Sequence, residues 1–254
     1  GSRRKWYIHN RPREKETYTE RVEIGKKKKN LMLVGDGMDA TIITRSLNTG
    51  DGIGLFQTFI VGNCPEMGLW PKILGSKITT GPQKASGPGW PLLVSADRAS
   101  LYRCMVDGFQ DALYVHDNWQ FYRDCYSTGT VDFIFGDAAV VLQNCSIVAR
   151  NSNLDQSRHH SKRSLAVHGR IIVGQLSCIL TLPNILITSD GRCRLEMNSW
   201  IHYIYFGEYS NSRSGIAVNK RVNWTTYHVI TSTTEVQQFT MAGLIQGGEW
   251  LKPI

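Results

Sequence analysis

Short apolar runs recur along the chain, and Gly, Asp and Asn separate them. Four such runs are Leu31–Val34, Phe59–Val61, Ala139–Leu142 and His228–Ile230. Stretches with strong helical periodicity are rare. Because short buried runs bounded by turn residues are typical of β-strands, the pattern predicts a chain built mainly of many short strands.

An internal repeat of about 20 residues organises these strands. Cys104, Cys125 and Cys145 are spaced by 21 and 20 residues, and Asp111 and Asp132 each lie seven residues after a cysteine of this series. A repeat of this length made of short strands is typical of a solenoid whose coils stack. The expected fold class is therefore all-β, a parallel β-helix, in which equivalent positions of successive coils lie about 4.8 Å apart.

Stacked coils bring equivalent side chains together. Cys104 would lie over Cys125, close enough for a disulfide. The even count of six cysteines permits disulfides and an oxidising compartment without demanding them. By the same geometry, Asp111 would lie over or near Asp132 on one face of the solenoid.

Two close carboxylates suggest acid–base chemistry. Because like charges repel, one of the two tends to keep a proton near neutral pH, which divides the pair into an acid and a base or nucleophile. Gln110, directly before Asp111, adds an amide donor that could stabilise an oxyanion.

The surroundings of the aspartates leave several interpretations open. Tyr114, Phe133 and Phe135 flank the pair and could form walls on which a sugar stacks. Alternatively, the aspartates cap turns, or they pair with Arg103 and Arg123, which occupy neighbouring coils. An aspartate pair also fits a glycoside hydrolase.

Charge and composition narrow the class of partner. The 254-residue chain has a net charge of +8 and a sequence pI of about 9.2, with 41% hydrophobic and 20% charged residues. These values are typical of a folded globular protein whose partner is polyanionic: an acidic polysaccharide, a nucleic acid or an anionic surface. A nucleic acid is the least favoured, because the lysines at 26–29 are not interleaved with a recognisable binding module.

Membrane and targeting signals are not evident in the sequence. No apolar run approaches the roughly 18 residues of a membrane span, and no signal-peptide pattern precedes the first strand. The sequence therefore predicts no membrane association, and either a cytosolic protein or a mature or clipped secreted chain.

Three segments around the aspartates resemble the central signatures of plant pectin methylesterases. They read FQDALYVH (Phe109–His116), QFYRDC (Gln120–Cys125) and GTVDFIFG (Gly129–Gly136). Four further segments are similar to other parts of that family in the same order: Ile24–Thr44, Tyr205–Ser212, Lys220–Glu235 and Ile245–Leu251.

The resemblance implies a fold, an activity and a setting. It implies a right-handed parallel β-helix that removes methyl esters from homogalacturonan, the pectin of the plant cell wall, and hence secretion. It implies no metal and no organic cofactor. We expect a monomer, with pectin as its partner and a proteinaceous inhibitor as a further possible partner.

The resemblance also assigns roles to individual residues. Asp132 matches the nucleophile that attacks the ester carbonyl. Asp111 matches the proton donor to the leaving methanol, which then activates water, and Gln110 matches an oxyanion donor. Cys104 and Cys125 match a pair that is disulfide-linked in plant members. Cys145 and Cys178 match a second pair by spacing.

Two segments depart from the family within what we expect to be one domain over residues 1–254. Residues 62–93 lack a clear counterpart of the family's QAVALR motif, whose glutamine is an oxyanion donor. Residues 155–204 lack its GRPW motif, whose arginine pairs with the nucleophilic aspartate. We therefore expect some coils to be disrupted or missing and the activity to be impaired. A non-catalytic pectin-binding protein and a β-helix glycosidase or lyase remain alternatives.

Overall fold

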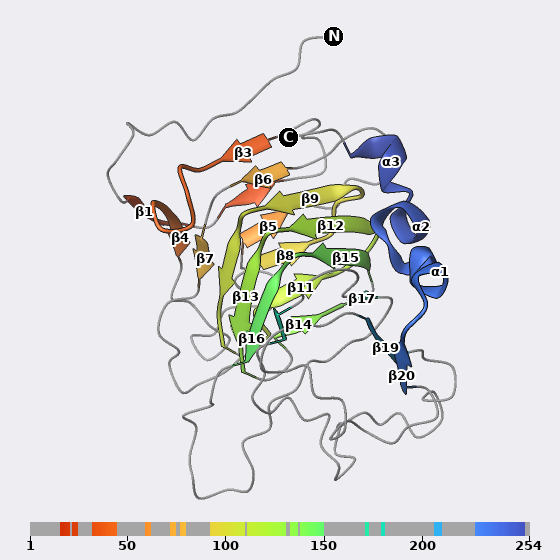
Figure 1. Ribbon diagram of the computed structural model, residues 1–254. Helices are drawn as coiled ribbons and strands as arrows, with labels where there is room; N and C mark the ends of the chain where they lie inside the picture. Colours follow the sequence, from red (N-terminus) through yellow and green to blue (C-terminus); the bar gives the residue numbers. More distant parts are fainter. Residues whose placement is uncertain are drawn as a thin grey trace, which may run out of the picture.

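Parallel strands make up most of the ordered structure. The computed structural model describes residues 16–20, 22–24, 32–44, 59–61, 72–74, 77–79, 92–109, 111–130, 133–136, 138–149, 171–172, 179–180, 206–209 and 227–251. Within these residues three sheets wrap around a common interior, and their strand pairs are parallel. Figure 1 shows their strands stacked one above another.

Each sheet collects one strand from successive coils. Sheet A consists of β1 (Glu16–Thr19), β4 (Thr41–Thr44), β7 (Lys77–Thr79), β10 (Met105–Asp107), β13 (Tyr126–Gly129), β16 (Ser146–Ala149) and β18 (Ile179–Leu180). Sheet B consists of β2 (Glu23–Ile24), β5 (Phe59–Val61), β8 (Leu92–Val94), β11 (Leu113–Val115) and β14 (Ile134–Phe135). Sheet C consists of β3 (Met32–Val34), β6 (Lys72–Leu74), β9 (Ala99–Tyr102), β12 (Trp119–Arg123), β15 (Ala139–Gln143) and β17 (Ile171–Ile172).

The chain visits the sheets in the order A, B, C and then begins the next coil. Met105 pairs with Tyr126 and Tyr126 pairs with Ser146, so neighbouring coils are offset by 21 and 20 residues. These are the spacings of the cysteine series in the sequence. The parallel β-helix predicted from the repeat is therefore confirmed. Each of the four apolar runs overlaps a strand, as the sequence pattern predicts.

A left-handed residue turns the chain from sheet C to sheet A in three successive coils. Arg103, Asp124 and Asn144 have φ values of 50°, 54° and 51°, and each directly precedes a cysteine. Beyond the corner, the backbone N–H of Tyr126 donates to the carbonyl oxygen of Cys104 at 2.9 Å. Because Asp and Asn tolerate this conformation better than most residues, two of the three corners are suited to it by sequence.

Side chains alternate between the interior and the outside of sheet B. Leu92, Leu113 and Ile134 occupy paired positions on neighbouring strands and are buried in the main core. Tyr114 and Phe135 are paired one residue later and are half-buried. This alternation places the two aromatic rings on the outer face, close to the segments that carry the candidate aspartates.

A buried polar network links β12 to β8. The side-chain Nε2 of Gln120 donates to the carbonyl oxygens of Val94 and Asp117, at 2.9 Å each. The Tyr122 hydroxyl donates to Gln120 Oε1 at 2.6 Å. Both side chains are fully enclosed, so the hydroxyl satisfies a carbonyl oxygen that water cannot reach.

We expect Tyr122→Phe to lower the free energy of unfolding by about 1–3 kcal/mol, because it leaves Gln120 Oε1 buried without a donor. Urea unfolding followed by circular dichroism measures the change. Tyr126→Phe is the matched control, since the half-buried Tyr126 makes no hydrogen bond through its hydroxyl within the described structure. Equal losses in the two variants would contradict the assigned role of the network.

Short helices follow the last strand pair, β19 (Phe206–Tyr209) with β20 (Tyr227–Ile230). They are α1 (Thr233–Val236), η3 (Gln237–Phe239), α2 (Met241–Ile245) and α3 (Gly247–Trp250). Ser232 and Thr240 cap α1 and α2 through side-chain oxygens. No helix in the described part of the chain is long and apolar enough to cross a membrane.

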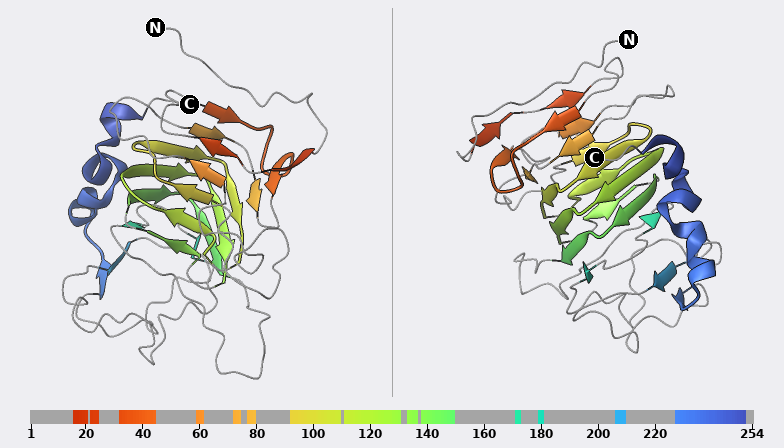
Figure 2. Two further views of the ribbon diagram at one scale, coloured as in Figure 1. Left: turned by 180° about the vertical axis from the view of Figure 1, so that it is seen from behind. Right: turned by 45° about the horizontal axis from the view of Figure 1, so that its top comes forward.

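The helices cover part of the outer face of sheet C, and Figures 1 and 2 show them along one side of the strand stack. Ile245 and Trp250 pack against Phe121 of β12 and Val141 of β15 in a second apolar cluster. The indole N–H of Trp250 donates to the carbonyl oxygen of Ile245 at 2.7 Å. The hydrophobic pattern along the sequence did not predict these helices.

Candidate active site

Asp111 lies at the corner where the chain passes from sheet A to sheet B. It follows β10, precedes β11 and has a φ of 56°, in the left-handed region. Its side chain is partly exposed. Neighbouring coils hold the corner on both sides, because Leu113 N donates to Phe133 O at 2.9 Å and Leu92 N donates to Ala112 O at 3.3 Å. Asp111 is thus an accessible carboxyl group on a fixed backbone.

The other two predicted catalytic residues, Gln110 and Asp132, lie outside the described residues. The structure does describe residues on either side of them. The backbone N–H of Thr130 donates to the carbonyl oxygen of Phe109 at 2.9 Å, and Leu113 pairs with Ile134. The offset of this pairing is 21 residues, equal to the separation of the two aspartates in the sequence. The aspartate pair therefore stays a prediction, supported by the register of the strands that follow it.

Gly129 allows the two coils to approach closely beside this corner. A Cβ atom at this position would lie 2.2 Å from Phe133 Cβ and 2.5 Å from the carbonyl oxygen of Phe109. Real Cβ atoms essentially never come so close to their neighbours, so a larger residue would push the two coils apart. This requirement explains a glycine at the start of the GTVDFIFG segment.

Three rings stand together on the outer face of sheet B. Tyr114 and Phe135 stack with their centroids 4.5 Å apart and their planes at 13°. His116 meets the Tyr114 ring edge to face at 5.0 Å. His116 was not among the predicted site residues, although it lies two residues after Tyr114, the spacing that places side chains on one face of a strand.

Phe133 does not belong to this aromatic surface, and the expectation that it forms a sugar-stacking wall is wrong. Its side chain is 0% exposed and belongs to the main core. It sits inside the coil, at the close approach to Gly129. The sequence places three aromatic residues near the aspartates, but the path of the corner before β14 turns the Phe133 side chain into the core.

The arginines of neighbouring coils are not at the aspartate corner. Arg103 and Arg123 both lie over the ring of Tyr102, at the corner between sheets C and A. Arg123 Nε is 3.4 Å from the Asp124 carboxylate. The alternative in which these arginines pair with the candidate aspartates is therefore not what the structure contains for Asp111.

Comparison with known proteins decides the family. Residues 4–171 and 176–248 match the sequence profile of the family described as Pectinesterase. The chain belongs to the pectinesterase family. The matched ranges include residues 62–93 and most of residues 155–204, the two segments that lack clear counterparts of the QAVALR and GRPW motifs.

The two relatives described next are plant proteins. The chain is 40% identical to "Pectinesterase/pectinesterase inhibitor 18" of Arabidopsis thaliana over 94% of this chain and 48% of that protein. It is 38% identical to "Pectinesterase 3" of Solanum lycopersicum over 92% of this chain and 48% of that protein. The chain thus spans about half the length of these relatives.

Solved structures show the same fold. Pectin methylesterase from carrot is 31% identical, with a TM-score of 0.73 over 95% of this chain and 86% of that chain. Pectin methylesterase from Aspergillus niger is 19% identical, with a TM-score of 0.61 over 94% of this chain and 85% of that chain. The second match concerns the fold alone.

The cysteines of the repeat stack as the sequence predicts. Cys104, Cys125 and Cys145 are buried one coil apart and are present as thiols. Each Sγ donates to the carbonyl oxygen two residues earlier, at 3.3, 3.3 and 3.4 Å. The Cys104–Cys125 disulfide is thus not formed in this structure and stays a prediction for the oxidised protein. Cys178, expected to pair with Cys145, lies outside the described residues.

Burial of this cysteine stack should make the protein sensitive to alkali. Burial raises the pKa of the Cys125 thiol well above its ordinary value of 9.0, and burial with nearby cysteine charge raises the pKa of the Tyr122 phenol above 10.0. The unfolded chain therefore ionises first. Stability is fully present below about pH 9 and falls as the pH rises above that value.

Urea unfolding between pH 7 and pH 11, with a reducing agent present, measures this fall. The variant Cys125→Ala/Tyr122→Phe lacks both groups and should show a smaller loss above pH 9 than the unchanged chain. Parallel pH profiles for the two proteins would contradict the explanation.

Proposed function

We propose that this chain removes methyl esters from the homogalacturonan of pectin, releasing methanol and leaving pectate. Membership of the pectinesterase family supports the proposal. The observation that carries the proposal is the position of Asp111 at the sheet A–B corner, where it is partly exposed. Strand β11, which follows Asp111, pairs with β14, which follows Asp132, at an offset equal to the separation of the two aspartates in the sequence. The reaction class is carboxylic ester hydrolysis by an aspartyl nucleophile.

The reaction proceeds in two steps. A carboxylate oxygen of Asp132 attacks the ester carbonyl carbon, and the amide of Gln110 donates to the oxyanion that forms. Asp111 gives its proton to the departing methoxide, so methanol leaves and an acyl-enzyme remains. Asp111 then takes a proton from water, and the resulting hydroxide attacks the acyl carbon. This second step frees Asp132 and leaves a uronate carboxylate on the polymer.

The stacked rings of Tyr114 and Phe135 supply a surface for the sugar. Their outer-face position beside the corner of Asp111 suits contact with a pyranose ring, whose C–H faces pack on aromatic planes. Edge contact from His116 restricts the Tyr114 ring. In this proposal the two rings bind the polymer next to the ester that is cleaved.

The rate is expected to be low for the family. The glutamine of QAVALR and the arginine of GRPW have no clear counterparts in the sequence. Losing one oxyanion donor raises the barrier by about 2.7–4 kcal/mol. Losing a cationic partner also makes it harder to keep a carboxylate ionised beside a second one. We therefore propose the esterase chemistry with an impaired rate.

Methanol release from highly esterified pectin tests the proposal. We expect slow release by the purified chain, and loss of that release in Asp132→Asn, which keeps the shape of the side chain but not the nucleophile. Absence of methanol from the unchanged chain, with pectin still bound, would replace the esterase with a non-catalytic pectin-binding protein. A fall in viscosity would indicate a glycosidase or lyase, because de-esterification leaves the polymer length unchanged.

The setting follows from the proposed substrate. We propose a secreted monomer that modifies pectin in the plant cell wall. Relatives that carry the name "Pectinesterase/pectinesterase inhibitor" support a proteinaceous inhibitor as a second partner. The net charge of +8 suits a polyanionic polysaccharide better than a neutral one.

A further inference from the structure

Two arginines share one tyrosine ring at the corner between sheets C and A. The guanidinium carbons of Arg103 and Arg123 each lie 5.0 Å from the ring centroid of Tyr102. Tyr102 and Arg123 occupy paired positions at the ends of β9 and β12, and Arg103 is the left-handed residue that follows Tyr102. We call these three residues the arginine–tyrosine cluster.

The cluster is open to solvent. Arg103 is exposed, the Arg123 side chain is 46% exposed, and Tyr102 is half-buried. The C-terminal helices cover Phe121, which lies two residues before Arg123 on the same face of β12. Phe121 belongs to the second apolar cluster, and Arg123 does not. Both guanidinium groups are therefore available to a ligand.

The cluster carries more positive than negative charge. Asp124, 3.4 Å from Arg123 Nε, is the carboxylate that neutralises it in part, and the same carboxylate accepts a hydrogen bond from Asn144. Arg103 has no ion pair in the part of the chain that the structure describes. Each guanidinium carbon is 5.0 Å from the Tyr102 ring centroid, so the two carbons are separated by at most twice that distance. These two positive charges repel each other, and a bound anion would reduce that repulsion.

Contact with the Tyr102 ring favours binding of carboxylates by the two guanidinium groups. Contact with an aromatic face orients a guanidinium and restricts its movement. The edge left free is a planar fork of N–H donors that matches a carboxylate in two parallel hydrogen bonds. Two such forks on one ring suit a polymer that presents carboxylates at regular intervals.

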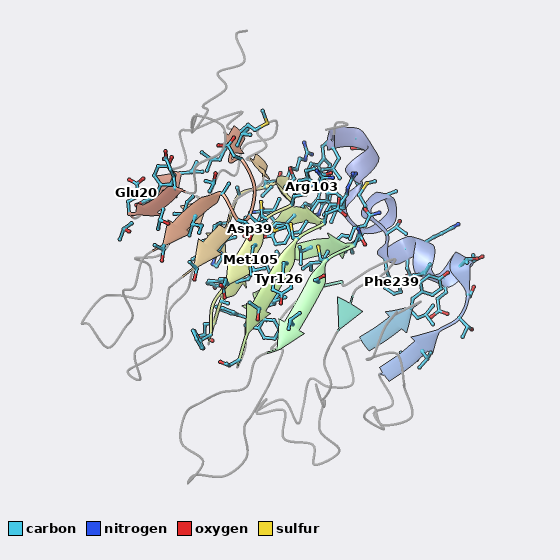
Figure 3. The ribbon with its side chains drawn as sticks, turned by 60° about the vertical axis from the view of Figure 1, so that its left-hand side comes forward. Glu20, Asp39, Arg103, Met105, Tyr126 and Phe239 are labelled. Carbon is cyan, nitrogen blue, oxygen red and sulfur yellow. The ribbon has the colours of Figure 1, made fainter. Side chains whose placement is uncertain are left out.

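The cluster is separate from the candidate active site. Strand β10, Met105–Asp107, leads from Arg103 at the sheet C–A corner toward Asp111 at the sheet A–B corner. Figure 3 labels Arg103 and Met105 at the beginning of this path, and Tyr126 on the neighbouring strand. A ligand on the cluster therefore contacts a different corner of the coil from the one that carries Asp111.

We propose that the arginine–tyrosine cluster is a second binding site, specific for the carboxylates of de-esterified homogalacturonan. The inference rests on the proposed function, because the ligand is the product of that reaction. Each ester cleaved turns a neutral group into a carboxylate. The cluster therefore binds the part of a polymer that has already been processed, and its contribution to binding grows as the reaction proceeds.

Affinity electrophoresis through gels that contain polygalacturonate tests the proposal, since this polymer has no ester to cleave. Arg103→Gln/Glu249→Gln removes one guanidinium and, by neutralising an exposed carboxylate on α3, keeps the net charge unchanged. We expect it to bind about tenfold more weakly than the unchanged chain. In gels of highly methyl-esterified pectin the two proteins should migrate alike.

A matched pair tests the sign of the effect. Asp124→Asn and Glu249→Gln each raise the net charge by one, but only Asp124 lies beside the cluster. Asn fits the left-handed backbone at position 124, so the corner is preserved. Asp124→Asn should bind polygalacturonate more tightly than Glu249→Gln does.

Three results would overturn the inference. One is unchanged retention of Arg103→Gln/Glu249→Gln on polygalacturonate. Another is an equal change in esterified pectin, which would indicate general polymer contact. The third is equal retention of Asp124→Asn and Glu249→Gln.

Thermal unfolding of each variant is measured alongside to check that it is folded. If Arg103→Gln unfolds, Arg103→Lys replaces it: lysine keeps the charge but lacks the planar fork of N–H donors, so this variant should also bind polygalacturonate more weakly. Absence of methanol release would contradict the proposed esterase activity. It would not affect the gel results, because polygalacturonate has no ester to cleave.

Discussion

Asp111→Asn should lower the rate of methanol release by about 10²–10⁴-fold, the usual contribution of a general acid or base. Asparagine has nearly the same shape but no proton to give to the leaving methoxide and no basic oxygen to accept one from water. The backbone at this position is left-handed, with a φ of 56°. Asparagine adopts this conformation readily, so the corner should keep its structure.

A proton assay at constant pH and a methanol assay follow the loss of activity, while near-ultraviolet circular dichroism checks the fold. Asp117→Asn is the control, because Asp117 is exposed at the next corner and its Oδ1 accepts from the Asn118 backbone N–H, a bond that an amide oxygen can keep. We expect the control to retain its activity. An Asp111→Asn variant as fast as the control would exclude Asp111 from proton transfer.

Gly136→Ala should destabilise the protein by several kcal/mol, about 3–5, or prevent it from folding. Gly136 has a φ of 131°, a conformation that side-chain-bearing residues rarely adopt. A Cβ atom would also lie 1.9 Å from the carbonyl oxygen of Val115 and 2.5 Å from its carbonyl carbon. Both neighbours are main-chain atoms of β11, so relief requires the coil to move rather than a side chain.

Gly248→Ala is the matched control, since a Cβ atom there meets nothing within 4 Å. Alanine in the helix α3 should leave stability unchanged or raise it by up to about 1 kcal/mol. Urea unfolding of both variants measures the difference. Two variants of equal stability would show that β11 and β14 can separate without loss, contrary to the packing described here.

The repeat was the part of the fold that the sequence predicted best. Because each coil must close on itself, equivalent residues recur at the length of one coil, and the cysteines record that length as 21 and 20 residues. The same reasoning predicted that Asp111 and Asp132 occupy equivalent positions of neighbouring coils, which stays a prediction because Asp132 lies outside the described residues. This spacing gives the strand register only for the coils that carry it, because other coils differ in length: Phe59 pairs with Leu92, an offset of 33 residues.

Features that depend on side-chain direction were harder to predict. Phe133 and Phe135 lie two residues apart, the spacing of a shared face, yet one is in the core and the other outside, because Phe133 precedes β14 at a corner. The helices at 233–250 are three to five residues long and contain three glycines, so they show no helical period. The pairing of Arg103 with Tyr102 depends on a left-handed corner that arginine rarely occupies.

The C-terminal helices also bear on how the chain folds. Coils built from neighbouring strands can assemble in order as the chain is synthesised, because most of their contacts are with the preceding coil. The surface formed by Phe121 and Val141 is different, because Ile245 and Trp250 cover it and are made much later. During synthesis this surface remains exposed and is open to aggregation or to chaperone binding. The last helices therefore act as a long-range closure that completes folding.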